Sequence, residues 1–451
     1  MSKYQTYPEY KDSGIDWLKE MPSHWHLRKA KHIFQRVQRP IRETDGVVTA
    51  FRDGQVTLRS NRRTDGFTNS LKEIGYQGVR VNDLLVHAMD GFAGAIGISD
   101  SDGKCSPVCS VCVPWNKENT NMPYYGYLVR QLAVTDFISS LAKGIRERST
   151  EFRFSEFSGL LLAYPPVEEQ TQIAAFLDHE TAKIDTLIEK QQQLIELLKE
   201  KRQAVISHAV TKGLNPDAPM KDSGVEWLGE VPEHWVVSSI KYLSSFVGTG
   251  GTPKDDSSFT EHEDICWFTP GDFKGTLTIS KSNKYVTKQS IARNDAKIYP
   301  RNSVLIIGIG ATLGKVALCK YDFSCNQQIN IVTPNNKIKS NFLAYALNAQ
   351  VEQMKLQSNS STIGIMNQEK TKQIAIAVPP INEQLSINSY INNVLEQFDK
   401  LLLKANKQID LLQERRTALI SAAVTGKIDV RNWVAPATSS DTNAAQQEVI
   451  A

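Results

Sequence analysis

Residues 11–25 read KDSGIDWLKEMPSHW, and residues 221–235 read KDSGVEWLGEVPEHW. The two stretches share ten identities in fifteen positions, at an offset of 210 residues. Their differences are conservative, as in the exchange of Ile15 for Val225. An internal repeat of this kind bears on the whole architecture and is considered before any shorter motif. The chain is therefore expected to consist of two halves that start alike.

A second pair of repeated stretches closes each half. Residues 197–211 read LLKEKRQAVISHAVT and residues 411–425 read LLQERRTALISAAVT, again ten identities in fifteen, now at an offset of 214. The same offset separates the Pro-Pro-x-x-Glu-Gln stretches that begin at Pro165 and Pro379. Each half thus has an opening motif, a variable stretch and a helical closing segment.

The closing segments have the pattern of long helices. From Glu168 to Ala209 the sequence contains no Pro or Gly, and apolar residues recur at the spacing of one helix face. About 40 residues at 1.5 Å each predict a helix of roughly 60 Å, a length that suits a spacer. A helix with one apolar stripe has to bury it, so we expect the two helices to pack antiparallel along that stripe. The expected pairing positions are Ile184, Leu187, Ile188, Ile195, Leu198, Leu402, Ile409 and Leu412.

The variable stretches, roughly residues 36–163 and 246–377, show no alignment by eye. Both contain short β-branched or aromatic runs, such as residues 47–51 and 303–307, separated by Gly, Asn and Asp turns. We therefore expect two α/β domains rich in irregular β structure. Together with the helices they give an α+β chain in a pseudo-twofold arrangement.

The composition is that of a globular protein. Of 451 residues 41% are hydrophobic and 22% charged, and no apolar run reaches the length of a transmembrane helix. The first residues lack the apolar stretch of a signal peptide, and six Cys do not suggest a disulfide framework, so we expect a reducing, cytoplasmic setting. The net charge is +3, with +2 in residues 35–160 and +5 in residues 244–380. These small excesses are a weak sign of a nucleic-acid partner.

Residues 308–316, GIGATLGKV, look like a phosphate-binding loop but fail its pattern. The loop needs Gly five places before its Gly-Lys pair, where this chain has Ile309, and Ser or Thr after Lys, where it has Val316. A strand followed by a tight Gly turn is the better interpretation. Such a turn would bring Lys315 near a phosphate of a nucleic-acid backbone.

Three other motifs also have structural interpretations. Residues 164–166 lack the Asn with which amino-methyltransferases hold a flipped base, and no Gly-rich cofactor loop precedes them. The cysteines between residues 105 and 112 have the irregular spacing of buried free thiols rather than that of a zinc site. His24 and His234 each precede a Trp, and packing explains them. We therefore expect no catalytic residues, no metal site and no cofactor in this chain.

Polar loops in the variable stretches suggest contacts with DNA. Arg pairs with guanine edges, and Asn or Gln with adenine edges, although a solvated surface explains any one such residue equally well. The candidate DNA-binding residues are Arg59, Arg62, Arg63, Arg146, Arg148, Thr249, Thr252, Lys254, Lys315, Asn326, Gln327 and Gln328.

Together, the repeated motifs resemble those of the specificity (S) subunits of type I restriction-modification systems. The resemblance rests on the two KDSG-x-x-WL-x-E-x-P-x-HW motifs, the Pro-Pro-x-x-Glu-Gln stretches and the two long helices that end in R-x-A-[VL]-I-S. It rests also on GTGGTP at residues 248–253 and STIG at residues 361–364. It spans nearly the whole chain up to about residue 433. In the first variable stretch, Gln38-Arg39-Pro40 stands where the Gly-rich opening would be.

The resemblance implies that each variable stretch is a target recognition domain that reads one half of a split DNA site in the major groove. It implies that the coiled-coil-like helices fix the spacing of the halves and bind two methyltransferase (M) subunits. With two restriction (R) subunits the assembly would be an adenine-specific methyltransferase and an ATP-dependent endonuclease. S-adenosylmethionine, ATP and Mg would bind those partners rather than this chain.

The expected domain boundaries follow from the motifs. The first target recognition domain takes residues 1–163, with its opening motif at 10–34, and the first spacer helix takes 164–213. The second target recognition domain takes 214–377, with its opening motif at 220–246, and the second helix takes 378–430. Residues 431–451 are expected to be a flexible tail.

One alternative from another class stays open. A repeat protein whose two variable domains bind other proteins would have the same shared ends. A basic concave face on both domains would favour DNA, and a neutral apolar face would favour protein partners. A fused methyltransferase or nuclease would need a catalytic signature, which the sequence does not show.

Overall fold

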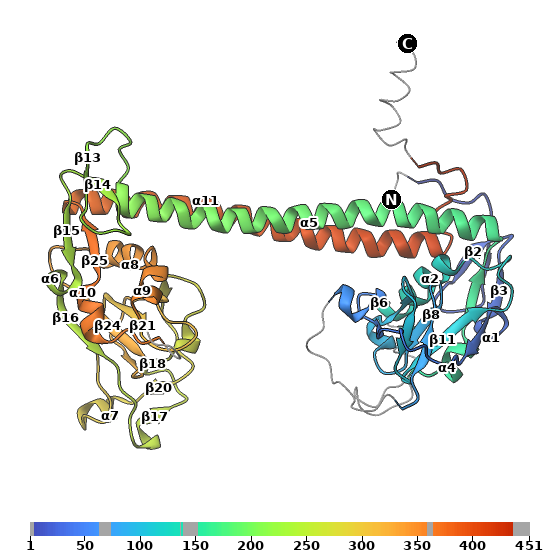
Figure 1. The fold of residues 1–451 in the computed structure, drawn as a ribbon, viewed down its shortest axis with the longest axis horizontal. Helices are drawn as coiled ribbons and strands as arrows, with labels where there is room; N and C mark the ends of the chain where they lie inside the picture. Colours follow the sequence, from blue (N-terminus) through green and yellow to red (C-terminus); the bar gives the residue numbers. More distant parts are fainter. Residues whose placement is uncertain (1–3, 63–73, 136, 139–151, 359–363, 436–451) are drawn as a thin grey trace, which may run out of the picture. The chain divides into compact units, whose positions relative to one another are not determined.

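The computed structural model describes residues 4–62, 74–135, 137–138, 152–358 and 364–435. The chain divides into two compact units, Met1–Gln191 with Lys407–Ala451, and Gln192–Asn406 (Figure 1). The first unit therefore contains the end of the chain as well as its beginning.

The opening motif forms the same small hairpin in both units. In each hairpin the Asp that ends the first strand accepts a hydrogen bond from the N–H of a glycine two residues on, at 2.9 Å for Gly14 and 3.0 Å for Gly224. Both glycines have a positive φ, 70° and 71°, which other residues rarely adopt. The repeated Lys-Asp-Ser-Gly sequence thus builds a turn. The strand pairs are β1 (Tyr10–Asp12) with β2 (Glu20–Pro22) and β13 (Met220–Asp222) with β14 (Glu230–Pro232).

The main sheet of the first unit has the strand order β4-β11-β8-β9 and is antiparallel throughout. Leu84 and Val86 face helix α2 (Met122–Val134), whereas Leu85 faces the hairpin of β5 (Val48–Ala50) and β6 (Val56–Leu58). Because alternate side chains of a strand point to opposite faces, the central strand is buried on both sides. The strands are β4 (Phe34–Val37), β11 (Cys109–Pro114), β8 (Leu84–His87) and β9 (Ile96–Ile98).

The main sheet of the second unit has the order β16-β24-β21-β22-β19. Val304 and Ile306 face helix α8 (Ser340–Asn348), and Leu305 and Ile307 face a core that includes Phe268 of a smaller sheet. The strands are β16 (Ser244–Thr249), β24 (Ile329–Pro334), β21 (Ser303–Ile307), β22 (Val316–Cys319) and β19 (Thr278–Ile279).

Short elements complete each unit. Strand pairs next to the long helices are β3 (His26–Lys29) with β12 (Leu161–Tyr164) and β15 (Val236–Ser239) with β25 (Ala375–Val378). The first unit also has α1 (Ala30–Ile33), η1 (Arg59–Asn61), β7 (Gln77–Val79), η2 (Gly91–Ala93), β10 (Gly103–Cys105) and α4 (Phe154–Gly159). The second unit also has α6 (Ile240–Leu243), η4 (Asp256–Ser258), β17 (Phe259–Thr260), β18 (Ile265–Phe268), η5 (Pro270–Asp272), β20 (Tyr285–Val286), α7 (Lys288–Ala292), β23 (Ser324–Cys325), α9 (Val351–Gln357) and α10 (Gln368–Gln373).

The two main sheets have the same register although their sequences share little. Leu84 pairs with Cys112 across β8 and β11, and the residues 220 positions later, Val304 and Val332, pair across β21 and β24. At this displacement residues 79–114 align with residues 299–334 without a gap and share six identities. One identity is an asparagine with positive φ before the central strand, at position 82 (71°) and position 302 (63°). The variable stretches therefore contain a repeat that is visible in the backbone.

Two long helices, α5 (Val167–Lys212) and α11 (Ile381–Val424), have segments in both units, and within each unit their segments lie side by side and antiparallel (Figure 1). In the first unit Nε of Arg416 lies 2.9 Å from Oδ1 of Asp185. In the second, Nη1 of Arg202 lies 3.1 Å from Oδ1 of Asp399. Both arginines open the repeated R-x-A-[VL]-I-S sequence, so this sequence supplies one interhelical ion pair per unit.

The seam between the helices follows an alternating three- and four-residue spacing, the heptad pattern of a left-handed coiled coil. Most expected pairing residues are buried or half-buried, but Leu187 is 48% exposed. It lies one residue before the seam position Ile188, and a shift of one residue on a helix turns the side chain by about 100°. The seam positions along α5, all buried or half-buried, are Leu177, Thr181, Ile184, Ile188, Gln191, Ile195, Leu198 and Arg202. Those on α11 include Phe398, Leu402, Ala405, Ile409 and Leu412.

Removing one of the interhelical ion pairs is expected to change stability only slightly. The side chains of Arg416 and Asp185 are 27% and 52% exposed, and exposed pairs contribute roughly 0.2–1 kcal/mol. A double-mutant cycle of Arg416→Ala and Asp185→Ala, measured by urea unfolding, should give a coupling energy of about this size that falls with added salt. A coupling above about 2 kcal/mol, undiminished by salt, would contradict this view of the pair.

Candidate nucleic-acid interface

A glutamate near the start of α5 holds the opening motif of the first unit against the helix. The Glu169 carboxylate accepts hydrogen bonds from Nε1 of Trp25 at 2.8 Å and from the Tyr7 hydroxyl at 3.1 Å. It also lies 2.6 Å from Nε2 of His24. Trp25 is fully buried, so its N–H depends on this one acceptor, and the domain is anchored on its helix at this point.

The second unit repeats the arrangement. Glu383 of α11 accepts a hydrogen bond from Nε1 of Trp235 at 3.1 Å and lies 2.8 Å from Nε2 of His234. The repeated His-Trp pair and the repeated Glu of Pro-Pro-x-x-Glu-Gln are therefore partners. Packing beside tryptophan is only part of the explanation for His24 and His234, because their ring nitrogens contact a carboxylate located on a distant part of the sequence.

The Gln that follows each of these glutamates is buried and fixes the start of its helix. Nε2 of Gln170 donates to the carbonyl of Pro165 at 2.9 Å, and its Oε1 accepts the N–H of Asn121 at 2.8 Å. Gln384 donates to the carbonyl of Pro379 at 2.9 Å in the same way. The repeated motif thus forms a joint that positions each sheet and its loops on the helix.

One end of the second sheet gathers most of the polar residues singled out in that domain. The N–H of Gly251 donates to the carbonyl of Cys325 at 2.8 Å, and the Thr252 hydroxyl donates to Oε1 of Gln327. A Cβ on Gly250 would lie 2.1 Å from the Asn326 carbonyl oxygen, so the close approach of the two loops requires glycine. We call residues 249–254, 308–315 and 326–328 the loop end of this sheet.

Two of the candidate residues at the loop end support its structure. The Thr249 hydroxyl donates to Oδ1 of Asn330 at 2.8 Å and accepts from Nε2 of Gln368 at 3.0 Å. Asn326 is buried, and its Nδ2 donates to Oε1 of Gln328 at 3.0 Å. The side chains that remain exposed or half-exposed to a partner are those of Thr252, Lys254, Lys315, Gln327 and Gln328.

Lys315 lies in the turn between β21 and β22, which adjoins these loops. The N–H of Gly308 donates to the carbonyl of Gln328 at 2.7 Å. Gly310 and Gly314 have φ values of 96° and 85°, which make the turn tight. A strand follows the turn, not a helix, as the strand-and-turn interpretation of this motif predicts.

In the first unit two of the candidate arginines lie on one 3₁₀ turn and its end. Nε of Arg59 donates to the hydroxyl of Thr49 at 2.9 Å. Arg62 pairs with Asp53, and its guanidinium lies 4.4 Å from the centre of the Phe51 ring. Burial acts to raise the pKa of Asp53, but the hydrogen bond and charge of Arg62 help to hold it below its usual value. The other candidates of this domain, Arg63, Arg146 and Arg148, lie outside the described residues.

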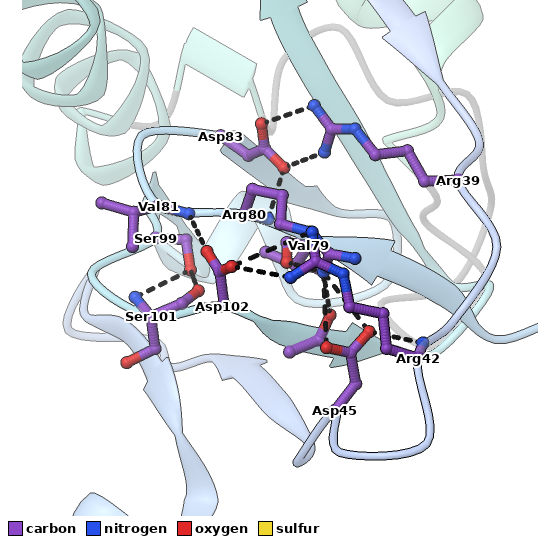
Figure 2. Close-up of polar contacts among 11 residues, drawn as sticks. Arg39, Arg42, Asp45, Val79, Arg80, Val81, Asp83, Ser99, Ser101 and Asp102 are labelled. Carbon is purple, nitrogen blue, oxygen red and sulfur yellow. Dashed lines mark hydrogen bonds and ion pairs between the residues drawn. The ribbon is translucent and has the colours of Figure 1, made fainter.

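Gln38-Arg39-Pro40 does not form a counterpart of the Gly-rich loop. Both terminal nitrogens of Arg39 donate to Asp83, which is buried (Figure 2). The N–H of Gly78, in β7, donates to the Arg39 carbonyl at 2.9 Å, so the backbone after β4 bonds to β7 here. The departure from the family pattern therefore has a structural cause: Arg39 is used inside the domain.

Figure 2 shows that this ion pair belongs to a larger network of arginine and aspartate side chains around the segment that leads into β8. Asp102 accepts the N–H of Val81 at 3.0 Å and Nη1 of Arg42 at 3.3 Å, and Nε of Arg80 lies 3.9 Å from it. The Val81 hydrogen bond, together with Arg80 and Arg42, keeps the pKa of Asp102 below its usual value against the opposing effect of burial. Nη1 of Arg80 also lies 3.3 Å from Asp45. The charges of this network are satisfied within the domain.

The cysteines are free, and five of the six are buried. Burial raises the pKa of Cys112 to about 12 and that of Cys319 to about 11, so these thiols stay protonated and unreactive at neutral pH. Among the described residues His, Cys, Asp and Glu do not gather in any group of three that could hold a metal ion. No described helix is both long and apolar enough to cross a lipid bilayer.

The fold defines a class of protein with two related domains, each packed on segments of two long helices. A family model described as "Type I restriction modification DNA specificity domain" matches residues 232–412. The EcoR124I/EcoR124II specificity subunit of Escherichia coli is 28% identical over 189 residues, 40% of this chain and 42% of the relative. The StySPI specificity subunit of Salmonella potsdam is 23% identical over 360 residues, 78% of this chain and 76% of the relative.

A solved structure titled as the basis of complex assembly and conformational transition of the type I R-M system contains a chain of the same fold. Its TM-score is 0.69 at 16% identity, and the match covers 90% of this chain and 99% of that one. The chain described here is therefore similar to type I restriction-modification specificity subunits over most of its length, and residues 232–412 match the specificity-domain model.

Proposed function

We propose that this chain is the DNA-recognition subunit of a type I restriction-modification complex and that each domain reads one half of a split target. The observation that carries the proposal is that the specificity-domain match, residues 232–412, contains the whole loop end of the second sheet. That end presents amides, a hydroxyl and two lysines, which are the groups that contact base edges and phosphates. These loops do not present an apolar face of the kind that suits a protein partner.

The proposed roles follow from exposure. Gln327 and Gln328 would contact base edges, because amides form paired hydrogen bonds with adenine. Lys254 and Lys315 would contact phosphates. Asn326, which is buried, and Thr249, whose hydroxyl bonds both Asn330 and Gln368, would hold the loops in shape rather than touch DNA. In the first domain Arg59 and Arg62 remain candidates for contacts with DNA.

The chain itself would be a non-catalytic scaffold. Two M subunits and two R subunits would supply adenine methylation and ATP-dependent cleavage, together with S-adenosylmethionine, ATP and Mg. The long helices offer apolar side chains outside their seam for docking M subunits. These are Leu187 and Leu411 in the first unit, at 48% and 50% exposure, and Leu194, Leu197, Leu401 and Leu403 in the second, at 42%, 61%, 47% and 71%.

The proposal predicts a specific effect of Lys254→Ala. Removing a phosphate contact should weaken duplex binding by the chain and its M subunits equally on all sequences, and should lower the slope of log affinity against log salt by about one. Binding is measured by fluorescence anisotropy at several salt concentrations. Lys404→Ala, an exposed lysine on α11, is the matched control and should leave the slope unchanged.

The same titration tests the proposed function against the protein-binding alternative. Wild-type complexes should bind duplex DNA with a steep salt dependence. If neither the chain nor its complex with M subunits binds duplex DNA at low salt, the recognition proposal is wrong and the domains bind something else.

A further inference from the structure

The two main sheets share their structure at the end that lies opposite the loop end. Before β8 the N–H of Val81 donates to Asp102 at 3.0 Å, and before β21 the N–H of Arg301 donates to Asp322 at 2.8 Å. Both pairs are related by the displacement of 220 residues, and each adjoins the asparagine with positive φ. The asparagine and aspartate that both sheets share at this end therefore have a structural role.

At the loop end the backbone frame is also shared, but the exposed side chains differ. The N–H of Ala88 donates to the carbonyl of Val108 at 2.9 Å, as the N–H of Gly308 does to Gln328 at 2.7 Å. Where the second unit has Lys315 and Gln327, the first has Ala95 and Pro107. Two domains that read different half-sites need the same backbone structure but different DNA-contacting side chains. The loop end of the sheets in this chain meets both requirements.

In the first unit the tip of the β5–β6 hairpin lies against this end and brings an arginine to it. Gly94, in the turn between β8 and β9, has φ 94°, and a Cβ there would lie 2.5 Å from the carbonyl oxygen of Arg52. Nη2 of Arg52 donates to Oδ1 of Asp90 at 2.8 Å, although the side chain of Arg52 is 71% exposed. The N–H of Asp90 donates in turn to Nδ1 of His87 at 3.0 Å, which fixes the turn.

We propose that Arg52, oriented by Asp90, is a specificity-determining residue of the first domain and reads a guanine of its half-site. The inference rests on the proposed function and names a residue for it. A guanidinium has five N–H donors, so one bond to a carboxylate leaves the others free to pair with O6 and N7 of guanine. The carboxylate lowers the entropy that a long side chain loses on binding, because it already holds the side chain in place.

The test compares base preferences of variants in the full-length chain assembled with its M subunits. Bound duplexes are recovered from a randomised pool and sequenced. With Arg52→Ala, the preference for guanine at one position of one half-site should fall about ten-fold or more, and the other half-site should be unchanged. Arg52→Lys keeps the positive charge but not the planar pair of N–H donors. It should lose the same preference while keeping most of the affinity.

The matched control is Arg42→Ala. Arg42 is also an exposed arginine paired with an aspartate, but it lies at the shared end, in the network of Figure 2. Its removal should leave both half-sites unchanged. The inference is overturned if Arg52→Ala leaves every base preference intact, if Arg52→Lys behaves as wild type, which would make Arg52 a phosphate contact, or if Arg42→Ala erases a preference instead. If the wild-type complex itself enriches no half-site, the proposed function fails first.

Discussion

Replacing Glu169 with alanine is expected to lower the free energy of unfolding of the first unit by roughly 3–6 kcal/mol, because two buried donors each lose a hydrogen bond to a charged group, which contributes roughly 1.5–3 kcal/mol. Glu169 is only 8% exposed and is the acceptor for Trp25 Nε1 and the Tyr7 hydroxyl. Without the carboxylate these buried donors have no acceptor, and each loses a hydrogen bond to a charged group. Hydrogen exchange under native conditions would localise the loss, because amides of the first unit should exchange faster.

Two variants serve as controls for this prediction. Glu169→Gln keeps an acceptor oxygen and should recover part of the stability. Glu383→Ala removes the equivalent residue of the second unit, where the side chain is 28% exposed and holds two partners, so its effect should be smaller and confined to that unit. An unfolding free energy unchanged by Glu169→Ala would show that the repeated motif does not join the domain to its helix.

Replacing Gln327 and Gln328 together with alanine is expected to abolish the preference for one half of the DNA target. Each paired amide contact contributes roughly 1–3 kcal/mol of discrimination, so losing both should reduce the preference of that half-site by about thirty-fold or more. The other half-site should still be enriched from a randomised pool. Asn326 is kept because it holds the turn in shape.

The control for this pair is another pair of adjacent glutamines. Gln192 and Gln193 are exposed on α5, and changing both to alanine should leave the base preferences of both half-sites intact. Loss of both half-sites in the Gln327/Gln328 variant would indicate unfolding, which circular dichroism would reveal. Retention of both half-sites in a folded variant would exclude this loop from base reading.

The repeated ends of the chain could be understood from the sequence because their pattern is local. Apolar residues at the spacing of one helix face predict the long helices, and the repeated Lys-Asp-Ser-Gly forms the same turn in both units. Assigning Leu187 to the seam was an error, since an apolar residue beside a seam position fits the stripe equally well until burial is known. The role of Glu169 was missed because its partners lie about 145 residues earlier in the chain.

The repeat inside the variable stretches was missed for a different physical reason. Strands such as residues 84–87 and 303–307 need only apolar side chains of suitable size, so one aliphatic residue replaces another and few identities survive. The identities that do survive have special backbone or polar roles, such as the asparagines with positive φ. Asn82 and Asp102 recur as Asn302 and Asp322 at one gap-free displacement of 220 residues, which is the signal of the repeat in the sequence.

The role of Arg39 also depended on the tertiary structure. Its partner Asp83 lies 44 residues away, and nothing near Arg39 in the sequence distinguishes an internal ion pair from a contact with DNA. The same holds for Arg52, because no sequence feature distinguishes it from Arg59 or Arg62. Only the structure distinguishes Arg52 from the other two, by the exposure of its side chain and by the position of the β5–β6 hairpin that carries it.

We propose that one chain carries two separate DNA readers and that the gap between their half-sites is constant. The most direct measurement is recovery of bound duplexes from a randomised pool by the full-length chain with its M subunits, at two salt concentrations. We expect two short, different half-sites separated by a constant gap, with the same gap at both salts. A single contiguous site, two half-sites at variable gaps, or no enrichment at all would contradict it.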